Sequence, residues 1–341
     1  MKKDRFLIFN ITTVLFLLFF MGFNLNGCSP DKPVQYAGPT KNVRIGLGKY
    51  SSDFSGLLFL ADIEGFFKEQ GLDITFVRMA SGAAAIRALP QGSVDMGIGT
   101  EFPFVKEIIQ GRNLKVITTI WRGDVLYIVG CRDRGIQEPS NFRGKKIAFT
   151  VGTQQEFFLG RYLLYHGLSL QDITVVNTKP MLLSDRVLSG KADGAVLPGP
   201  ALAMARGELR GNIVSWSVQY EQPTYGLIAC RSEFVKSHPD IIKRFLDALR
   251  DAELHYLDNP QKARTQILGY PVRKDSFYKN DLPLLTYVLF LDKPFLVMLE
   301  DEARWFIEKG ESHTRDVPNF LEFIYFDGLE SAKPEGISIV R

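Results

Sequence analysis

Residues 74–103 read ITFVRMASGAAAIRALPQGSVDMGIGTEFP, and residues 173–201 read ITVVNTKPMLLSDRVLSGKADGAVLPGPA. Each stretch predicts the same order of elements: a strand, a loop, a helix, a Gly-x-x-Asp turn, a second strand and a loop. Two βαβ units always look somewhat alike, but a shared turn at the same place favours an internal repeat of one unit. We therefore expect two similar α/β lobes. The aligned pairs are Ile74 and Ile173, Val77 and Val176, Arg87 and Arg186, Leu89 and Leu188, Gly92 and Gly190, and Asp95 and Asp193.

The segments before residue 74 extend this pattern toward the N-terminus. We expect a strand over Val43–Leu47, a helix from about Gly56 to Gln70, and a strand over Asp73–Val77. Ser55 is a candidate cap for the helix, and Gly71 is its expected end. Strands that alternate with helices predict a largely parallel sheet.

Ligands of open α/β sheets bind at the carboxyl ends of the strands. We therefore expect the loops that follow the strands to line a cleft between the two lobes. Ser81-Gly82 and Thr100-Glu101 form one wall, and Lys179-Pro180 and Pro198-Gly199-Pro200 form the other.

The first residues predict export from the cytoplasm. Lys2, Lys3 and Arg5 precede an almost wholly apolar run over 6–23, which is the pattern of a signal peptide. A transmembrane anchor is the alternative, because about 20 apolar residues can span a bilayer. The run ends at Leu25-Asn26-Gly27-Cys28, which resembles a bacterial lipobox. That resemblance implies a signal peptide over 1–27, a lipid on Cys28 and a tether over 28–42.

Composition narrows the classes of function. The net charge is +3 and no basic run occurs, so nucleic acid is not an expected partner. About 300 residues remain after the tether, which suggests two lobes and not one. Cys131 and Cys230 are far apart with no Cys-x-x-Cys motif. The four histidines are isolated without metal-ligand spacing, so we expect no metal and no cofactor.

Five segments, taken in order, are similar to one family of proteins: IEGFFKEQGLDITF, SGAAAIRALPQGSVDMGIGTEFP, FRGKKIAFTVGTQQEFFLGRYL, VLSGKADGAV and YGLIACRSEFVKSHPDIIKRFLDAL. The chain resembles the nitrate/sulfonate/taurine-type solute-binding proteins of ABC importers and their thiamine-precursor-binding relatives, over about residues 43–255. The resemblance implies a two-lobed type II periplasmic-binding fold, in which each lobe is a mostly parallel sheet flanked by helices.

The resemblance also implies where the chain passes between the lobes. Lobe one would hold residues 43–124 and 225–341, with helices at its C-terminal end, and lobe two would hold residues 125–224. Val125–Arg132 would be a strand added to lobe two, and Tyr225–Arg231 a strand added to lobe one. Cys131 and Cys230 would then lie in different lobes as reduced thiols.

The candidate ligand-binding residues follow the strands of both lobes. In lobe one a helix entry offers backbone N–H groups to an anion, and at the crossover an indole can stack on a planar solute while a guanidinium grips an oxyanion. In lobe two a glycine allows the backbone to approach the ligand closely. Helix capping, support of a helix dipole and an ordinary surface arginine are the structural alternatives. The candidates are Lys49, Tyr50, Asp53, Phe54, Ser81, Gly82, Thr100, Glu101, Trp121 and Arg122 in lobe one, Gly152, Thr153, Gln154 and Pro198 in lobe two, and Tyr225 at the return crossover.

The family resemblance implies that this chain captures a small solute by hinge closure and passes it to permease and ATPase subunits on other chains. We expect a monomer without enzymatic activity, exported and lipid-anchored in the periplasm or outside the cytoplasmic membrane. Two alternatives remain: a sensory module for a membrane receptor, and a pyrimidine-synthesising enzyme of the thiamine-precursor family. The enzyme needs a lysine Schiff base and histidine chemistry, and no histidine falls in a predicted site loop. Residues of both charges leave the solute undecided between a sulfonate, nitrate and a pyrimidine-like molecule.

Overall fold

The computed structural model describes residues 36–49, 52–219, 222–275 and 285–340. The predicted signal peptide, the lipidated Cys28 and most of the tether lie outside these residues, as do Tyr50 and the side chain of Asp53. Among the helices of the described residues, none combines the length and the apolar character needed to cross a bilayer.

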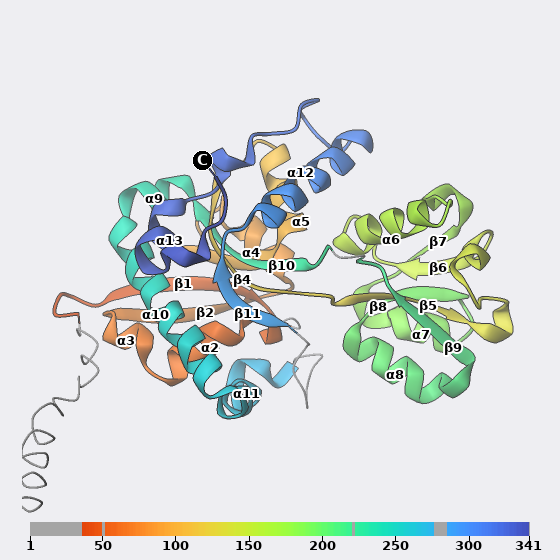
Figure 1. Cartoon of the computed structure of the whole chain (residues 1–341), viewed down its shortest axis with the longest axis horizontal. Coiled ribbons are helices and arrows are strands. Elements are labelled where there is room, and N and C mark those ends of the chain that lie inside the picture. Colours follow the sequence, from red (N-terminus) through yellow and green to blue (C-terminus); the bar gives the residue numbers. More distant parts are fainter. Residues whose placement is uncertain (1–35, 50–51, 220–221, 276–284, 341) are drawn as a thin grey trace, which may run out of the picture. The chain divides into compact units, whose positions relative to one another are not determined.

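Two separate sheets make up the framework (Figure 1). The first has six strands in the order β11-β4-β10-β3-β1-β2, in which β1 runs parallel to β2 and β3, while β10 is antiparallel to β3 and β4. We call this sheet with its helices the first lobe. Its strands are β1 (Lys41–Gly48), β2 (Leu72–Met79), β3 (Met96–Thr100), β4 (Leu114–Gly123), β10 (Thr224–Arg231) and β11 (Thr286–Phe290).

The second sheet has five strands in the order β7-β6-β8-β5-β9, and we call it with its helices the second lobe. Here β6 runs parallel to β7 and β8, while β5 is antiparallel to β8 and β9. The pairing therefore repeats that of β1, β2, β3, β10 and β4. The strands are β5 (Leu126–Cys131), β6 (Lys146–Phe149), β7 (Thr174–Asn177), β8 (Gly194–Pro198) and β9 (Ile213–Ser217).

The chain passes between the sheets twice, from β4 to β5 and from β9 to β10. The first strand after each crossing, β5 or β10, pairs antiparallel with a parallel strand of its sheet, β8 or β3. Cys131 ends β5 and Cys230 lies in β10, and both are buried free thiols.

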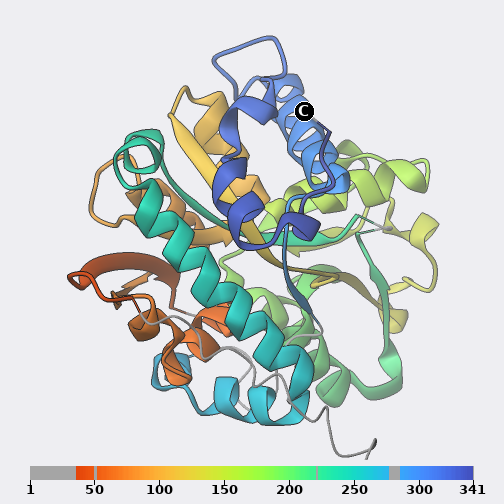
Figure 2. The ribbon, with the colours of Figure 1, turned by 60° about the vertical axis from the view of Figure 1, so that its left-hand side comes forward.

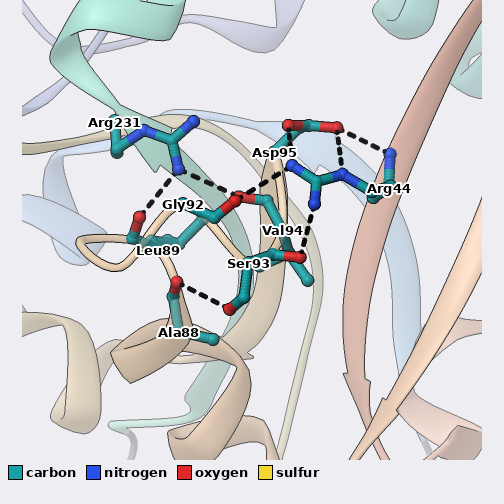
Figure 3. Close-up of polar contacts among 8 residues, drawn as sticks. All are labelled: Arg44, Ala88, Leu89, Gly92, Ser93, Val94, Asp95 and Arg231. Atoms are coloured by element: carbon teal, nitrogen blue, oxygen red, sulfur yellow. Dashed lines mark hydrogen bonds and ion pairs between the residues drawn. The ribbon is translucent and has the colours of Figure 1, made fainter.

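The Gly-x-x-Asp turns make the same backbone contacts in both lobes, which confirms the predicted repeat. The Asp95 carboxylate accepts from the backbone N–H of Arg44 at 2.9 Å, and the Asp193 carboxylate accepts from that of Lys146 at 2.8 Å. The Arg44 guanidinium adds two bonds to Asp95 (Figure 3). Asp95 thus ties the start of β3 to β1, and Asp193 ties the start of β8 to β6.

An arginine from outside the repeat holds each turn closed. Arg231, at the end of β10, donates to the carbonyl oxygens of Leu89 and Val94 at 2.8 and 3.0 Å (Figure 3). Arg134, beyond β5, makes the corresponding pair of bonds in the second lobe. Both glycines of the turns take a left-handed φ, +69° at Gly92 and +74° at Gly190, which residues with a side chain rarely adopt.

Helices surround both sheets, and the long α10 contacts α2, α3 and α13 of the first lobe (Figure 2). The first-lobe helices are α2 (Gly56–Ile63), α3 (Phe66–Glu69), α4 (Gly82–Ala88), α5 (Glu101–Ile109), α9 (Ser232–Ser237), α10 (Pro239–Asp258), α11 (Pro260–Gly269), α12 (Lys293–Glu308) and α13 (Phe326–Ala332). The second-lobe helices are α6 (Gln154–Tyr165), α7 (Leu183–Leu188) and α8 (Gly199–Leu209).

Four local features of the structure differ from the predictions. The single helix predicted from Gly56 to Gln70 is two helices, because Gly65 has a φ of +82° and breaks the ladder. Ser55 makes no side-chain cap there. β1 begins at Lys41, inside the segment predicted as tether, and β11 was not predicted at all.

Candidate functional site

Two predicted site residues from different lobes contact each other directly. The Thr100 hydroxyl, where β3 meets α5, donates to the side-chain oxygen of Gln154 at 2.7 Å. The amide nitrogen of Gln154, at the start of α6, donates to the hydroxyl of Thr224 at 3.0 Å. These three residues, which we call the interlobe relay, join the second lobe to two strands of the first. All three lie at strand ends or a helix N-terminus, where ligands of α/β sheets bind.

Gln219 connects both crossovers and was not predicted from sequence. Its side-chain oxygen accepts from the backbone N–H groups of Val125 and Leu126 at 2.5 and 2.9 Å. Its amide nitrogen donates to Thr224 at 3.1 Å, so one side chain that is 1% exposed ties the first crossover to the second. No local pattern marks this glutamine, because Val125 and Leu126, which donate to its side chain, are more than 90 residues away in the chain.

Glu101 is fully buried and serves the return crossover. One of its carboxylate oxygens accepts from the backbone N–H of Tyr225 at 3.0 Å, and the other has no partner among the described residues. Glu302, on α12, is also fully buried, and neither of its oxygens has a described partner. Burial raises the pKa of Glu101 to about 8, and burial together with the nearby Glu101 raises that of Glu302. This pair therefore retains at least one proton at neutral pH.

Trp121 belongs to the interior of the first lobe in this structure. Its ring stacks on Phe54 with centroids 4.8 Å apart, its exposed fraction is 1%, and its indole N–H has no described partner. Gly226 also lies against the indole, and a Cβ there would be 1.8 Å from the indole nitrogen. Contact of Trp121 with a solute, as the sequence predicted, would require Phe54 to move.

The charged candidates of the first lobe have partners or intermediate exposure. Arg122 forms an ion pair with Asp292 at 3.2 Å and lies over the Phe290 ring. Asp292 also caps α12 through the backbone N–H of Phe295. Lys49 follows β1, half-buried, with its backbone N–H bonded to the Met79 carbonyl oxygen.

The Gly152 loop is tied to α6 and, through it, to α12. The N–H of Gly152 donates to the Glu156 carboxylate at 2.8 Å, and that carboxylate also pairs with Lys309. Gly152 has a φ of +75° with open space where a side chain would be. Thr153 caps α6 by accepting from the N–H of Gln155. A ligand that takes the Gly152 N–H must therefore displace Glu156.

The C-terminal helix α12 also contacts the second lobe, which the sequence did not predict. Asp301 pairs with Arg161 of α6 at 3.0 Å and accepts from Gln222 at 3.3 Å. Trp305 packs against Gly160, where a Cβ would lie 2.3 Å from its ring. Trp305, on α12 of the first lobe, therefore packs on the second lobe.

The remaining candidates act on local backbone or pack closely. Ser81 caps α4 by accepting from the N–H of Ala84 at 3.1 Å. Gly82 packs against Gly99, and Pro198 ends β8 opposite Leu126. Tyr225 is 1% exposed, and its ring packs against two phenylalanines of β11 and α12, Phe290 and Phe295.

Metal-ligating groups do not gather in the described part of the chain, where no cluster of three or more His, Cys, Asp or Glu side chains suits a metal ion. His166 follows α6, His238 lies between α9 and α10, and His255 lies on α10 against Gln266. None of these three histidines is in the interlobe relay or the loops beside it.

Comparison with known proteins assigns the family. The model of a family described as NMT1/THI5 like matches residues 52–263, which is more than half of the chain. The chain belongs to the NMT1/THI5-like family. This membership confirms the resemblance to the sulfonate- and taurine-type binding proteins and their thiamine-precursor relatives.

Of two similar proteins, one is named as a binding protein and the other as an enzyme. The taurine-binding periplasmic protein of Escherichia coli is 26% identical over 201 residues, covering 57% of this chain and 61% of that protein. The match thus spans less than two thirds of that relative. A yeast 4-amino-5-hydroxymethyl-2-methylpyrimidine phosphate synthase, THI12 of Saccharomyces cerevisiae, is 24% identical over 247 residues, covering 67% of this chain and 70% of the relative.

A solved structure confirms the predicted fold. The periplasmic aliphatic sulphonate binding protein SsuA of Escherichia coli superposes with a TM-score of 0.67 at 19% identity, covering 83% of this chain and 92% of SsuA. NMT1/THI5-like membership and this superposition agree with the two sheets described above. The chain has the two-lobed type II periplasmic-binding fold.

Proposed function

We propose that this chain is the solute-binding component of an ABC importer and that it captures an oxyanion-bearing organic solute between its lobes. Residues 43–124 and 225–341 would form lobe one and residues 125–224 lobe two, and permease and ATPase subunits would be separate chains. The interlobe relay carries the proposal, because a solute bound beside Thr100 and Gln154 would contact both lobes and favour their closed arrangement.

The state of Glu101 favours an anionic solute over an amine. Its carboxylate binds the Tyr225 N–H and lies beside Glu302, so it is not open to a solute cation. The hydroxyl, amide and backbone N–H donors of Ser81, Thr100, Gln154 and Gly152 suit sulfonate oxygens. A solute would take the place of Gln154, Thr224 and Glu156 as the present acceptors of the last three donors. The names of the taurine- and sulphonate-binding relatives make sulfonates the first class to test.

A pyrimidine-synthesising enzyme is the second candidate, because of the similarity to the yeast synthase. That chemistry would need a histidine near the relay. His166, His238 and His255 lie outside the relay and the loops beside it, and the fourth histidine, His313, lies in the segment after α12. Formation of a pyrimidine phosphate by the purified chain with pyridoxal phosphate would favour this candidate.

Replacing Gln154 with alanine is expected to weaken sulfonate binding about tenfold, since two hydrogen bonds of the relay are lost at about 0.5–1.5 kcal/mol each. Titration calorimetry with taurine and longer alkanesulfonates measures the change in Kd. Gln137→Ala, at an exposed position of the same lobe, is the matched control and should bind as wild type does. Equal affinities for both variants would place the solute away from the relay.

Replacing Cys28 with serine is expected to release the protein from the membrane, because the lipobox-like segment would lose its lipidated thiol. Cells grown with labelled palmitate should label the wild type and not the variant. Cys131→Ser, which removes a buried thiol of β5, should leave labelling unchanged. Undiminished label on Cys28→Ser would contradict lipidation at this residue.

A further inference from the structure

A cavity of about 660 Å³ lies at the end of the first sheet away from the crossovers. It opens beside the start of β4, whose other end reaches the first crossover. Lys115 and Arg122 are seven residues apart on this strand, which corresponds to about 23 Å at about 3.3 Å per residue. The cavity is therefore remote from the interlobe relay. It is lined by Ile108, Gly111, Arg112, Asn113, Lys115, Ser232, Lys236, Glu322 and Phe323.

The cavity has three cationic side chains against one carboxylate. Arg112 and Lys236 make no side-chain hydrogen bond or ion pair with any residue that the structure describes. Lys115 donates to the backbone carbonyl oxygen of Glu322. Burial lowers the pKa of Lys115, the Glu322 carboxylate opposes this, and the nearby Lys236 ammonium lowers the pKa further. The ammonium groups of Lys115 and Lys236 repel each other, so an anion between them would be stabilised.

Neutral donors complete the lining. The Ser232 hydroxyl is buried and donates to the Asn113 side-chain oxygen at 2.5 Å. The Asn113 amide nitrogen is a donor, and it has no acceptor among the described residues. Cations beside an oriented amide donor match a group with several anionic oxygens.

We propose that this cavity, lined by Arg112, Lys115 and Lys236, is a second binding site that takes a phosphate group, distinct from the solute site between the lobes. A phosphate carries up to two charges and several acceptor oxygens, which matches the excess of cations. The volume of the cavity exceeds that of a free phosphate ion, so a phosphate ester also fits the proposal. A soluble monoester and the headgroup diester of a phospholipid share this chemistry.

Calorimetric titration of the full chain in neutral detergent with inorganic phosphate tests the site. Lys115→Gln/Lys236→Gln should weaken phosphate binding about tenfold or more, since two charge-assisted bonds are lost. Lys68→Gln/Lys191→Gln removes the same charge from exposed positions and should change Kd less than about twofold. Equal losses in both double variants, or no phosphate binding by wild type, would overturn the proposal.

A gain of binding separates recognition from a folding defect. Glu322→Gln removes the one carboxylate of the lining and keeps the carbonyl bonded to Lys115, so phosphate should bind more tightly. Unchanged or weaker binding would count against the site. Gln154→Ala should leave phosphate binding unaltered, which keeps this test independent of the proposed solute function.

Two further probes identify the source of the phosphate. Glycerol 3-phosphate represents soluble monoesters, and dihexanoyl-phosphatidylglycerol below its micelle concentration represents lipid headgroups. Stronger binding of one probe, abolished in Lys115→Gln/Lys236→Gln, assigns the source. Binding of both probes that is insensitive to the double variant would refute a phosphate site in this cavity.

Discussion

Replacing Gly226 with alanine is expected to destabilise the protein by about 3 kcal/mol or more, the upper end of overpacking in a core. The added Cβ would lie 1.8 Å from the indole nitrogen of Trp121 and 2.1 Å from Cε2. The indole cannot retreat easily, because it is buried and stacked on Phe54. Urea unfolding followed by circular dichroism measures the loss.

A matched glycine and a double variant make this test specific. At Gly207, on the exposed side of α8, a Cβ meets nothing within 4 Å, so alanine should be neutral or stabilising by about 0.5–1 kcal/mol. Trp121→Phe should remove part of the conflict, so Gly226→Ala/Trp121→Phe should be more stable than the sum of the single losses. Additive losses would mean that the indole is not what excludes a side chain at Gly226.

Replacing Glu302 with methionine is expected to stabilise the protein at pH 8 by about 1–3 kcal/mol, the cost of an unsatisfied buried polar group. Neither carboxylate oxygen of Glu302 has a hydrogen-bond partner among the described residues, so none of those contacts is lost. Methionine cannot ionise, so the neighbouring Glu101 would also lose the one acidic group that opposes its ionisation from α12. Methionine has a similar length and is readily accommodated in a core.

The pH dependence has a definite sign. Glu101 has a pKa of about 8 when folded and about 4.5 when unfolded. Between these values the folded state holds a proton that the unfolded state has released, so wild-type stability falls as pH rises from about 4.5 to about 8. The pKa of Glu302 is also raised by burial and by Glu101, so Glu302 adds to this fall. Glu302→Met should therefore flatten the fall when urea unfolding is repeated across the range.

Glu308→Met is the control, because it makes the same change at an exposed position of α12. It should leave the pH dependence of the free energy of unfolding as in wild type. Wild-type stability that stays constant or rises between pH 5 and pH 8 would show that the buried carboxyl pair holds no proton.

The repeat was predictable because its signals are local. A glycine with a left-handed φ and an aspartate three residues later are fixed by the geometry of one turn, and both copies kept them as Gly92 with Asp95 and Gly190 with Asp193. Alternating strands and helices then predicted parallel sheets. The same locality limits the prediction: Gly65 breaks a helix whose apolar pattern is continuous.

The candidate site was predicted in part. Thr100 and Gln154 were named from their places after strands, and the structure joins them by a hydrogen bond. Glu101 was named by the same rule and Trp121 from its place at the crossover, yet both are buried with partners inside the lobe. Position after a strand indicates which residues are near the site, and only the surrounding side chains determine which of them face solvent.

The sequence by itself determined the family, the two repeated units and the loops at their strand ends, because each depends on residues close together in the chain. Only the tertiary structure decided that Gln219 bonds both crossovers, that Glu302 lies buried beside Glu101, and that α12 contacts α6. These contacts join residues that are far apart in the chain, and glutamate on an amphipathic helix has the same local pattern whether it faces water or another carboxylate. Their energies depend on burial and on partners, which exist only once the chain has folded.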